Sequence, residues 1–149
     1  KFHNLRNYAV IFFIFLILIF SLVPTYLNYN KEFEDLNDFK FIRENSEIDK
    51  TVIAPLNYGH VVNHFSKRKN VIDSNFLLAP DAQQRYYDIN LVYSGWSYTK
   101  ALEILKEYNA EYIYINQDIK KSYNINELKY IQDGKCIQQI KENLYKVVC

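Results

Sequence analysis

The sequence predicts a small α/β domain that follows an N-terminal transmembrane helix. Three observations favour this fold class: an uncharged apolar stretch near the start, short apolar segments alternating with helical ones, and two β-rich runs around a turn at the end. We expect residues 1–28 to form the membrane helix with a short cytoplasmic flank. Residues 29–149 are then an extracytoplasmic domain with a mixed sheet, parallel in the centre and antiparallel at one edge, and a C-terminal β-hairpin.

Composition and charge narrow the classes of protein further. The 149 residues are enough for one domain with a hydrophobic core. The chain has 18 basic and 17 acidic side chains, and a net charge of +1 argues against nucleic acid as a main partner. Three Gly and three Pro exclude collagen-like and low-complexity classes. There is no Met, even at position 1, so we expect the chain to be part of a longer protein.

Residues 8–27 form the predicted membrane span. These twenty residues contain no charge, and a helix of that length spans about 30 Å, the thickness of a bilayer's hydrocarbon core. The alternative is a secretory signal peptide with the first seven residues as its basic region. The apolar run is long for that class, and no cleavage pattern of small residues follows Val23. The lipid bilayer is therefore the expected partner of this segment.

The charged flanks of the span predict its orientation. Lys1 and Arg6 precede it with no acidic residue nearby, whereas four acidic residues lie between positions 32 and 38. The positive-inside rule places the N-terminal end in the cytoplasm and the rest of the chain outside the cell membrane.

The first half of the domain shows helix and strand patterns in turn. Residues 30–44 have apolar side chains at a spacing of three and predict an amphipathic helix. Residues 51–54 predict a buried strand that ends at a proline, followed by a loop at 56–59. Residues 60–65 suit one or two helical turns, and residues 70–73 predict a second strand.

The second half begins with a long segment, residues 74–95, that we expect to be irregular or weakly helical. Ser97 is a good N-cap for a helix that ends near Asn109. Residues 111–116 predict the third strand, whereas residues 120–128 are polar and fit no element clearly. Further β segments are expected around Tyr130 and in the C-terminal hairpin.

The hairpin contains both cysteines of the chain, Cys136 and Cys149. If Glu142–Asn143 is the turn, Lys141 faces Leu144, and counting outward places Cys136 opposite Cys149 in a non-hydrogen-bonded pair. Side chains approach closely enough there for a disulfide. The alternative is two free buried thiols. A disulfide would support the extracytoplasmic location.

Two histidines form the first candidate for chemistry. His60 and His64 are four residues apart and would share a helix face, as metal ligands do. Val61 occupies the place of a zinc peptidase's glutamate base, and Asp73 is the nearest third ligand. We therefore expect a polar surface and no metal. The three scattered glycines exclude a phosphate-binding loop, and the cysteines lie too far along the chain from the histidines for a nucleophile–base pair.

The segment from Pro55 to Asp73 is the most unusual part of the sequence. It combines a loop at a strand end, two histidines, the basic run Lys67–Lys69 and an aspartate that ends the next strand. In α/β sheets, ligands bind at the carboxyl ends of strands. The alternatives are a solvated sheet edge and, for the basic run, a contact with lipid headgroups.

Three stretches resemble a known family: FIRENSEIDKTVIAPLNYGHVVNHFSKRKNVIDSNF, YTKALEILKEYNAEYIYI and NLYKVV. Together they are similar to the C-terminal tail of the oligosaccharyltransferase catalytic subunit and of related C-type, polyprenyl-dependent membrane glycosyltransferases. The resemblance extends over nearly the whole chain in the order of its elements. It implies a last membrane helix followed by an extracytoplasmic α/β domain.

In true oligosaccharyltransferases the loop after the first strand is Trp-Trp-Asp-Tyr-Gly, which recognises the hydroxyl residue of the acceptor sequon. This chain matches that motif at Tyr58 and Gly59, with Pro55, Leu56 and Asn57 in the other three places. The difference implies a relative that takes another acceptor. The family's catalytic acids lie in loops between earlier membrane helices, so this part of the chain should be inactive alone.

The resemblance therefore implies the C-terminal part of a polytopic membrane glycosyltransferase that moves sugar from a polyprenyl-linked donor to an extracytoplasmic acceptor. It implies no catalytic residue and no cofactor in this part, and it allows a divalent metal in the missing catalytic part. The expected acceptor-side residues are Asn57, Tyr58, Gly59 and His60, with Arg68 and Asp73 as their support. The alternative is a non-enzymatic, single-span anchored domain that binds a partner or serves a structural role.

Overall fold

The computed structural model of the chain describes residues 12–13, 15–17, 19–20, 36–75, 78, 80–131 and 136–149. The chain consists of two compact units, Lys1–Leu36 and Asn37–Cys149. The second unit contains the whole sheet and is called the domain below.

In the first unit, the described residues between positions 12 and 20 are helical. Their Phe and Ile side chains are exposed, from 40% for Ile19 to 75% for Phe20. Within the described part of the chain, no helix combines the length and the apolar character that crossing a bilayer requires. Most of the predicted span, residues 8–27, lies outside the described residues, so the span stays a prediction.

The domain begins with a helix whose described part extends to residue 45. The predicted amphipathic helix at 30–44 is confirmed over these residues, because Phe39 and Ile42 are fully buried. Asn45 ends the helix and bonds back to the carbonyl of Phe41 at 2.9 Å.

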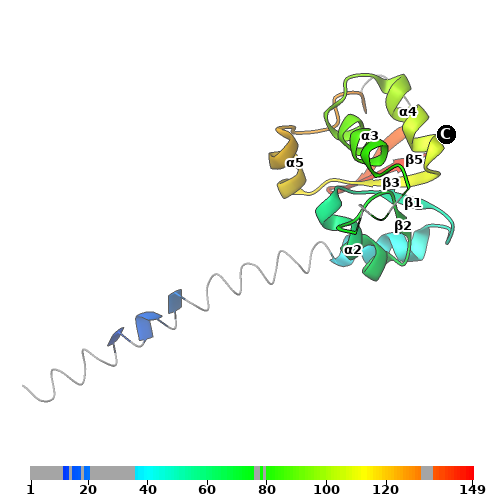
Figure 1. Cartoon of the computed structure of the whole chain (residues 1–149). Coiled ribbons are helices and arrows are strands. Elements are labelled where there is room, and N and C mark those ends of the chain that lie inside the picture. Colours follow the sequence, from blue (N-terminus) through cyan, green and yellow to red (C-terminus); the bar gives the residue numbers. More distant parts are fainter. Residues whose placement is uncertain are drawn as a thin grey trace, which may run out of the picture. The chain divides into compact units, whose positions relative to one another are not determined.

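A five-stranded mixed sheet forms the centre of the domain (Figure 1). Its strands are β1 (Thr51–Ile53), β2 (Lys69–Asn70), β3 (Ala110–Tyr114), β4 (Ile137–Lys141) and β5 (Leu144–Val147). They lie in the order β2-β1-β3-β5-β4. β1 pairs in parallel with β2 and β3, and β5 pairs antiparallel with β3 and β4. The predicted mixed sheet with an antiparallel edge is therefore confirmed.

Helical elements connect the strands. They are the 3₁₀ turn η1 (Leu56–Tyr58), α2 (Gly59–Val61), the π-helical turn η2 (Val62–Ser66), α3 (Ala82–Ser94), α4 (Tyr98–Glu107) and α5 (Gln117–Tyr123). The predicted N-cap is confirmed at α4, where the Ser97 side chain accepts a bond from the Lys100 amide. Asn116 caps α5 in the same way by accepting from the Ile119 amide.

The structure corrects three predictions about elements. β2 has two residues and starts at Lys69, so the buried residues Val71 and Ile72 continue past it without strand pairing. The segment expected to be irregular or weakly helical contains the regular 13-residue helix α3, whose weak amphipathic pattern includes the buried polar residue Asp88. Tyr130 lies in a turn, where its hydroxyl donates to the carbonyl of Val92 at 2.6 Å.

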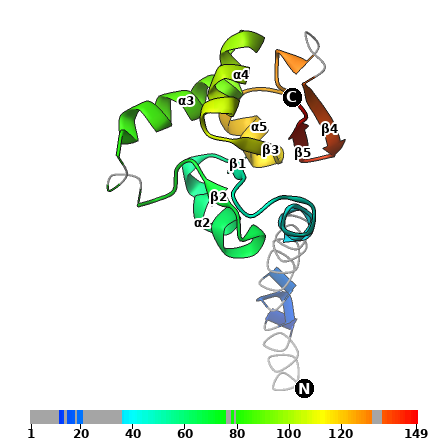
Figure 2. The ribbon, with the colours of Figure 1, turned by 90° about the vertical axis from the view of Figure 1, so that its right-hand side faces the viewer.

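Helices cover both faces of the sheet. Figures 1 and 2 show α3 and α4 on one face and α2 on the other. Tyr112 and Tyr114 are two residues apart in β3 and point to the same face of the sheet: Tyr114 packs on Phe39 with ring centroids 4.7 Å apart, and Tyr112 packs on Phe41 at 6.5 Å. The first helix of the domain thus covers the face opposite to α3 and α4.

The C-terminal hairpin pairs Lys141 with Leu144, as predicted. A bulge between Gln139 and Lys141 then shifts the register, so that Ile137 lies opposite Val147. The predicted direct opposition of the two cysteines is therefore wrong, and the Val148 amide donates to the carbonyl of Cys136. Cys136 and Cys149 nevertheless form a disulfide, with their Cα atoms 5.1 Å apart.

Candidate functional site

The candidate site lies where the three parallel strands end. Pro55 follows β1, Asp73 follows the buried residues after β2, and Asn116 follows β3. Because parallel strands point the same way, these three ends lie at one edge of the sheet, the usual place for ligands in α/β folds. Loops that leave this edge therefore determine what the site presents.

Gly59 brings two of these loops into contact. A Cβ atom at this position would lie 2.4 Å from the carbonyl oxygen of Ile72 and 2.5 Å from the Cβ of Asp73. The backbone of Gly59 is in the ordinary right-handed helical region. The glycine is thus required by close packing of α2 against the segment after β2.

His60 extends from α2 over the same segment. One of its ring nitrogens, Nε2, bonds to the Ser74 hydroxyl, and the other, Nδ1, lies 4.0 Å from a carboxylate oxygen of Asp73. That distance is too long for a hydrogen bond. The other Asp73 oxygen accepts from the Asn75 amide at 2.9 Å and so holds the turn. The cluster therefore presents an imidazole, a hydroxyl and a carboxylate to solvent without a charge-relay geometry.

Tyr58 connects the loop after β1 to the end of β3. Its hydroxyl accepts from the Asn116 amide at 2.8 Å, and its ring lies 5.5 Å from that of Tyr114. Asn116 is buried and also caps α5, so one side chain positions both the loop and the helix. Tyr58 is therefore partly a structural residue.

Arg68 has its contacts elsewhere in the domain. Its guanidinium donates to the carbonyls of Arg43 and Ser46, at the C-terminal end of the first helix. The side chain is 8% exposed. The other two members of the basic run, Lys67 and Lys69, are exposed. Of the six residues named from the sequence, the structure thus brings Gly59, His60 and Asp73 into contact, while Tyr58 points to Asn116 and Arg68 to the helix end.

An open groove of about 490 Å³ adjoins the cluster. The loops and helices that surround it contribute Pro55, Leu56, Asn57, Ser74, Tyr86, Asn90, Ser122 and Tyr123. Asn57, the remaining residue named from the sequence, therefore lines this groove together with the histidine's partner Ser74.

One of the two groove tyrosines, Tyr123, lies in surroundings of low polarity. Burial, followed by the neighbouring Tyr86, raises the pKa of Tyr123 to about 12. The ring of Tyr123 stacks on that of Tyr93, with centroids 4.8 Å apart and planes 29° apart. One wall of the groove is therefore a fixed aromatic surface.

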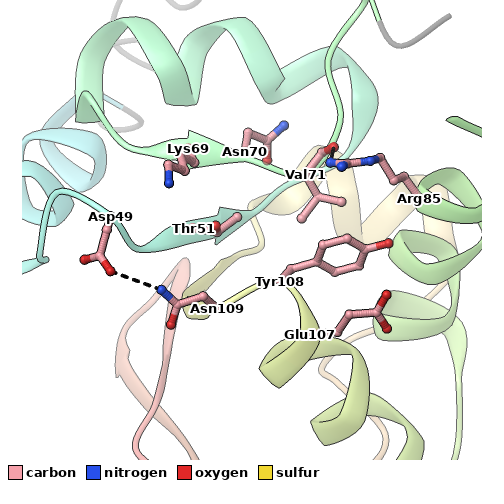
Figure 3. A pocket seen from close by; sticks show the side chains of 9 residues that line it. All are labelled: Asp49, Thr51, Lys69, Asn70, Val71, Arg85, Glu107, Tyr108 and Asn109. Atoms are coloured by element: carbon pink, nitrogen blue, oxygen red, sulfur yellow. Dashed lines mark hydrogen bonds between the residues drawn. The ribbon is translucent and has the colours of Figure 1, made fainter. Parts of the chain in front are cut away.

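A second pocket, of about 300 Å³, lies near the amino ends of β1 and β2 (Figure 3). Figure 3 shows the Asn109 amide bonded to Asp49 at one side, and Arg85 and Tyr108 at the other. Arg85 is committed to the carbonyls of Val71 and Pro80. This pocket contains both signs of charge, of which Asp49 and Arg85 are bonded within the protein, and it lies away from the strand ends of the candidate site.

His60 and His64, which the sequence places four residues apart, do not face one another. The ring of His64 lies edge-on to Phe65, with centroids 4.8 Å apart, whereas His60 faces Ser74 and Asp73. Among the residues that the structure describes, no three His, Cys, Asp or Glu side chains converge as a metal site would require.

Sequence reasoning missed five groove residues: Ser74, Tyr86, Asn90, Ser122 and Tyr123. All but Ser74 lie on α3 and α5, in segments predicted to be irregular or weakly helical, or too ambiguous to assign. A partial signal exists in α3, because Ile89, Val92 and Tyr93 recur at spacings of three and four and are buried. For α5 the only local signal in the sequence is its N-cap residue, Asn116.

Comparisons with known proteins identify the fold. No protein-family model matches the sequence, and no curated protein matches it. The structure is similar to the C-terminal globular domain of an oligosaccharyltransferase from Archaeoglobus fulgidus, with a TM-score of 0.53 and 12% sequence identity. The match covers 74% of this chain and 94% of that domain. The chain thus shares the fold of an oligosaccharyltransferase C-terminal domain.

Proposed function

We propose that this chain is the C-terminal part of a polytopic membrane glycosyltransferase of the oligosaccharyltransferase-like type. It would transfer sugar from a polyprenyl-linked donor to an acceptor outside the cytoplasm. The observation that supports this most directly is the fold shared with an oligosaccharyltransferase C-terminal domain over 94% of that domain's length. The Tyr58–Gly59 loop at the carboxyl end of β1 is where we place the acceptor-side surface.

Two features support a membrane-bound protein with its domain outside. Between positions 12 and 20 the described residues are helical and expose their Phe and Ile side chains, which suits contact with lipid. The disulfide between Cys136 and Cys149 suits an oxidising compartment, because cytosolic thiols are kept reduced. The first feature favours a membrane span, and the second favours a domain outside the cytoplasm, as the flanking charges suggest.

The proposed acceptor surface around Tyr58–Gly59 has Asn57 and His60 as its exposed polar side chains, with Asp73 as their support. The histidine side chain is 55% exposed, and that of its neighbour Asp73 is 28% exposed. An imidazole beside a carboxylate donates and accepts hydrogen bonds, which suits a hydroxyl-bearing acceptor. The reaction itself would take place on acids in other parts of the parent protein, where a divalent metal would also bind.

The experiment compares two histidine variants in the full-length parent protein in its own membranes. We expect His60→Ala to lower transfer at least about tenfold, because the acceptor loses a positioning contact worth on the order of 1.4 kcal/mol. His64→Ala is the matched control, since its ring contacts Phe65 and lies outside the cluster. Glycan attached to extracytoplasmic acceptors is measured by mass spectrometry, beside the amount of each variant in the membrane.

Equal transfer by both variants and the unmodified protein would remove the loop from the mechanism. A full set of glycans in cells that lack the parent protein would instead favour the non-enzymatic, anchored binding domain.

A further inference from the structure

The groove beside the His60 cluster has an unusual chemistry for a protein in which 23% of the residues are charged. Of the eight described residues that line it, none is charged. Two tyrosines, two asparagines and two serines surround an apolar floor that includes Pro55 and Leu56. An anionic ligand would find no cation here, and a cationic ligand would find no carboxylate.

We propose that this groove binds a neutral saccharide, stacked on its tyrosine rings and bonded through its hydroxyls to the asparagine and serine side chains. The inference rests on the proposed function and deepens it, since it names the class of ligand held beside the acceptor surface. The volume of about 490 Å³ is within the range of small-molecule pockets.

The aromatic wall is built to remain in place. Tyr123 is backed by the fully buried Tyr93, on which its ring stacks. Tyr86 is 50% exposed, so much of its ring is available to a ligand. The apolar face of a pyranose ring packs on such surfaces because its C–H groups meet the negative face of the aromatic ring.

The polar side chains have capacity left for a ligand. Asn90 donates one amide hydrogen to the Tyr86 carbonyl at 2.8 Å, which leaves its carbonyl oxygen and its second hydrogen. Ser122 donates its hydrogen to the Asp118 carbonyl at 2.8 Å, which leaves its oxygen as an acceptor. Asn57 adds an exposed amide from the loop after β1. These groups suit the mixed donors and acceptors of sugar hydroxyls.

The alternative occupant is an uncharged segment of acceptor peptide. Extended peptides gain affinity from main-chain bonds to an unpaired strand edge. The described residues that line this groove come from loops and from α3 and α5, so they offer no strand edge. Recognition through side-chain rings, amides and hydroxyls favours the saccharide.

The test is saturation-transfer NMR on the full chain in lipid nanodiscs. The probes are cellobiose, maltose and N,N′-diacetylchitobiose, with glucuronic acid, glucosamine and an acetylated Asn-Ala-Thr peptide amide as comparators. We expect at least one neutral disaccharide to bind, and Tyr86→Ala to weaken that binding about tenfold. Tyr87→Ala is the matched control, because it is 57% exposed on the same helix and does not line the groove. Its affinity should stay within about twofold.

Ser122→Arg is the second variant. It fills the groove with a long side chain from an exposed helix position, where a basic residue is tolerated near the C-terminus. Circular dichroism checks that each variant is folded, and Ser122→Arg should also abolish the saccharide signal. The inference is overturned if a folded chain binds none of the three disaccharides, or if Tyr86→Ala removes binding of the peptide instead.

These results are independent of the transfer assay. Loss of transfer in His60→Ala together with no disaccharide binding would leave the proposed function standing and refute the saccharide groove. Disaccharide binding together with normal transfer in His60→Ala would support the saccharide groove and remove the His60 loop from the proposed function.

Discussion

The ammonium group of Lys141 lies 2.7 Å from a carboxylate oxygen of Asp38. This ion pair joins the last hairpin of the domain to its first helix, across 103 positions of sequence. The second carboxylate oxygen accepts from the Asn143 amide at 3.0 Å. Asp38 is 6% exposed, so its charge depends on these two partners rather than on water.

Replacing Lys141 with methionine should destabilise the domain by about 2 kcal/mol, because it leaves a nearly buried carboxylate with a single donor. Lys100→Met is the matched control: its partner Glu103 is 60% exposed, so the loss should stay below about 0.5 kcal/mol. Urea unfolding followed by circular dichroism gives both values. Equal effects would show that the Lys141 pair is as weak as a surface pair.

Gly59→Ala should destabilise the domain by about 1–3 kcal/mol, because the new methyl group would overlap the backbone of Ile72 and Asp73. The two loops must separate to make room, so the same variant should also weaken the contact between His60 and Ser74. Thermal unfolding measures the first effect and the chemical shifts of the His60 ring measure the second. Asn63→Ala, an exposed change in the same helical segment, should alter neither.

Stability should fall as the pH rises above 10. Burial raises the pKa of Tyr93 well above its ordinary value, and its hydroxyl lies 2.8 Å from the carbonyl of Tyr114 and 3.1 Å from that of Ile53. The unfolded chain loses this proton near pH 10 while the folded chain keeps it, so the contribution to stability is complete below pH 10 and is lost above it.

Tyr93→Phe should therefore flatten the alkaline part of the profile by up to about 1.4 kcal/mol per pH unit. Tyr123, whose pKa is raised to about 12, contributes in the window from pH 10 to 12. Urea unfolding at a series of pH values measures the slope, and tyrosinate absorbance reports the ionisation. Tyr87→Phe is the exposed control, and a slope that Tyr93→Phe does not change would contradict the assignment.

The disulfide closes a loop between positions 13 residues apart and so restricts the unfolded chain. Its reduction should therefore lower the free energy of unfolding by about 3 kcal/mol. The double variant Cys136→Ser with Cys149→Ser should lose as much and should no longer respond to reductant. Free-thiol titration of the unfolded protein gives the redox state. Two free thiols in protein isolated from its own cells would argue against the pairing.

Local patterns predicted most of the fold. The apolar run of β3 and the serine before α4 are local signals, and both behave as predicted: Tyr112, Ile113 and Tyr114 are buried, and the serine caps the helix. The segment of α3 was predicted only as irregular or weakly helical, because Asp88, a buried residue, interrupts its apolar face. Its carboxylate is satisfied by Gln84 and by the hydroxyl of Tyr108, the second of which is distant in sequence.

The candidate site was predictable only in part, for a similar reason. The composition of the Pro55–Asp73 segment predicted a site there, and Gly59, His60 and Asp73 are in contact in the structure. The groove depends on where α3 and α5 pack against that segment, which is a matter of tertiary contacts. Arg68 shows the converse: a basic residue in a polar run is held by helix carbonyls more than 20 positions earlier.

The two outer edges of the sheet have a consequence for copies of this protein crowded together. β2 pairs over only two residues, one of which is the exposed Lys69, and β4 is interrupted by the bulge next to Ile140. Short, charged or bulged edges are poor templates for another strand. Strand-to-strand aggregation between neighbouring domains is thereby discouraged at both sides, even where the chains are concentrated on one surface.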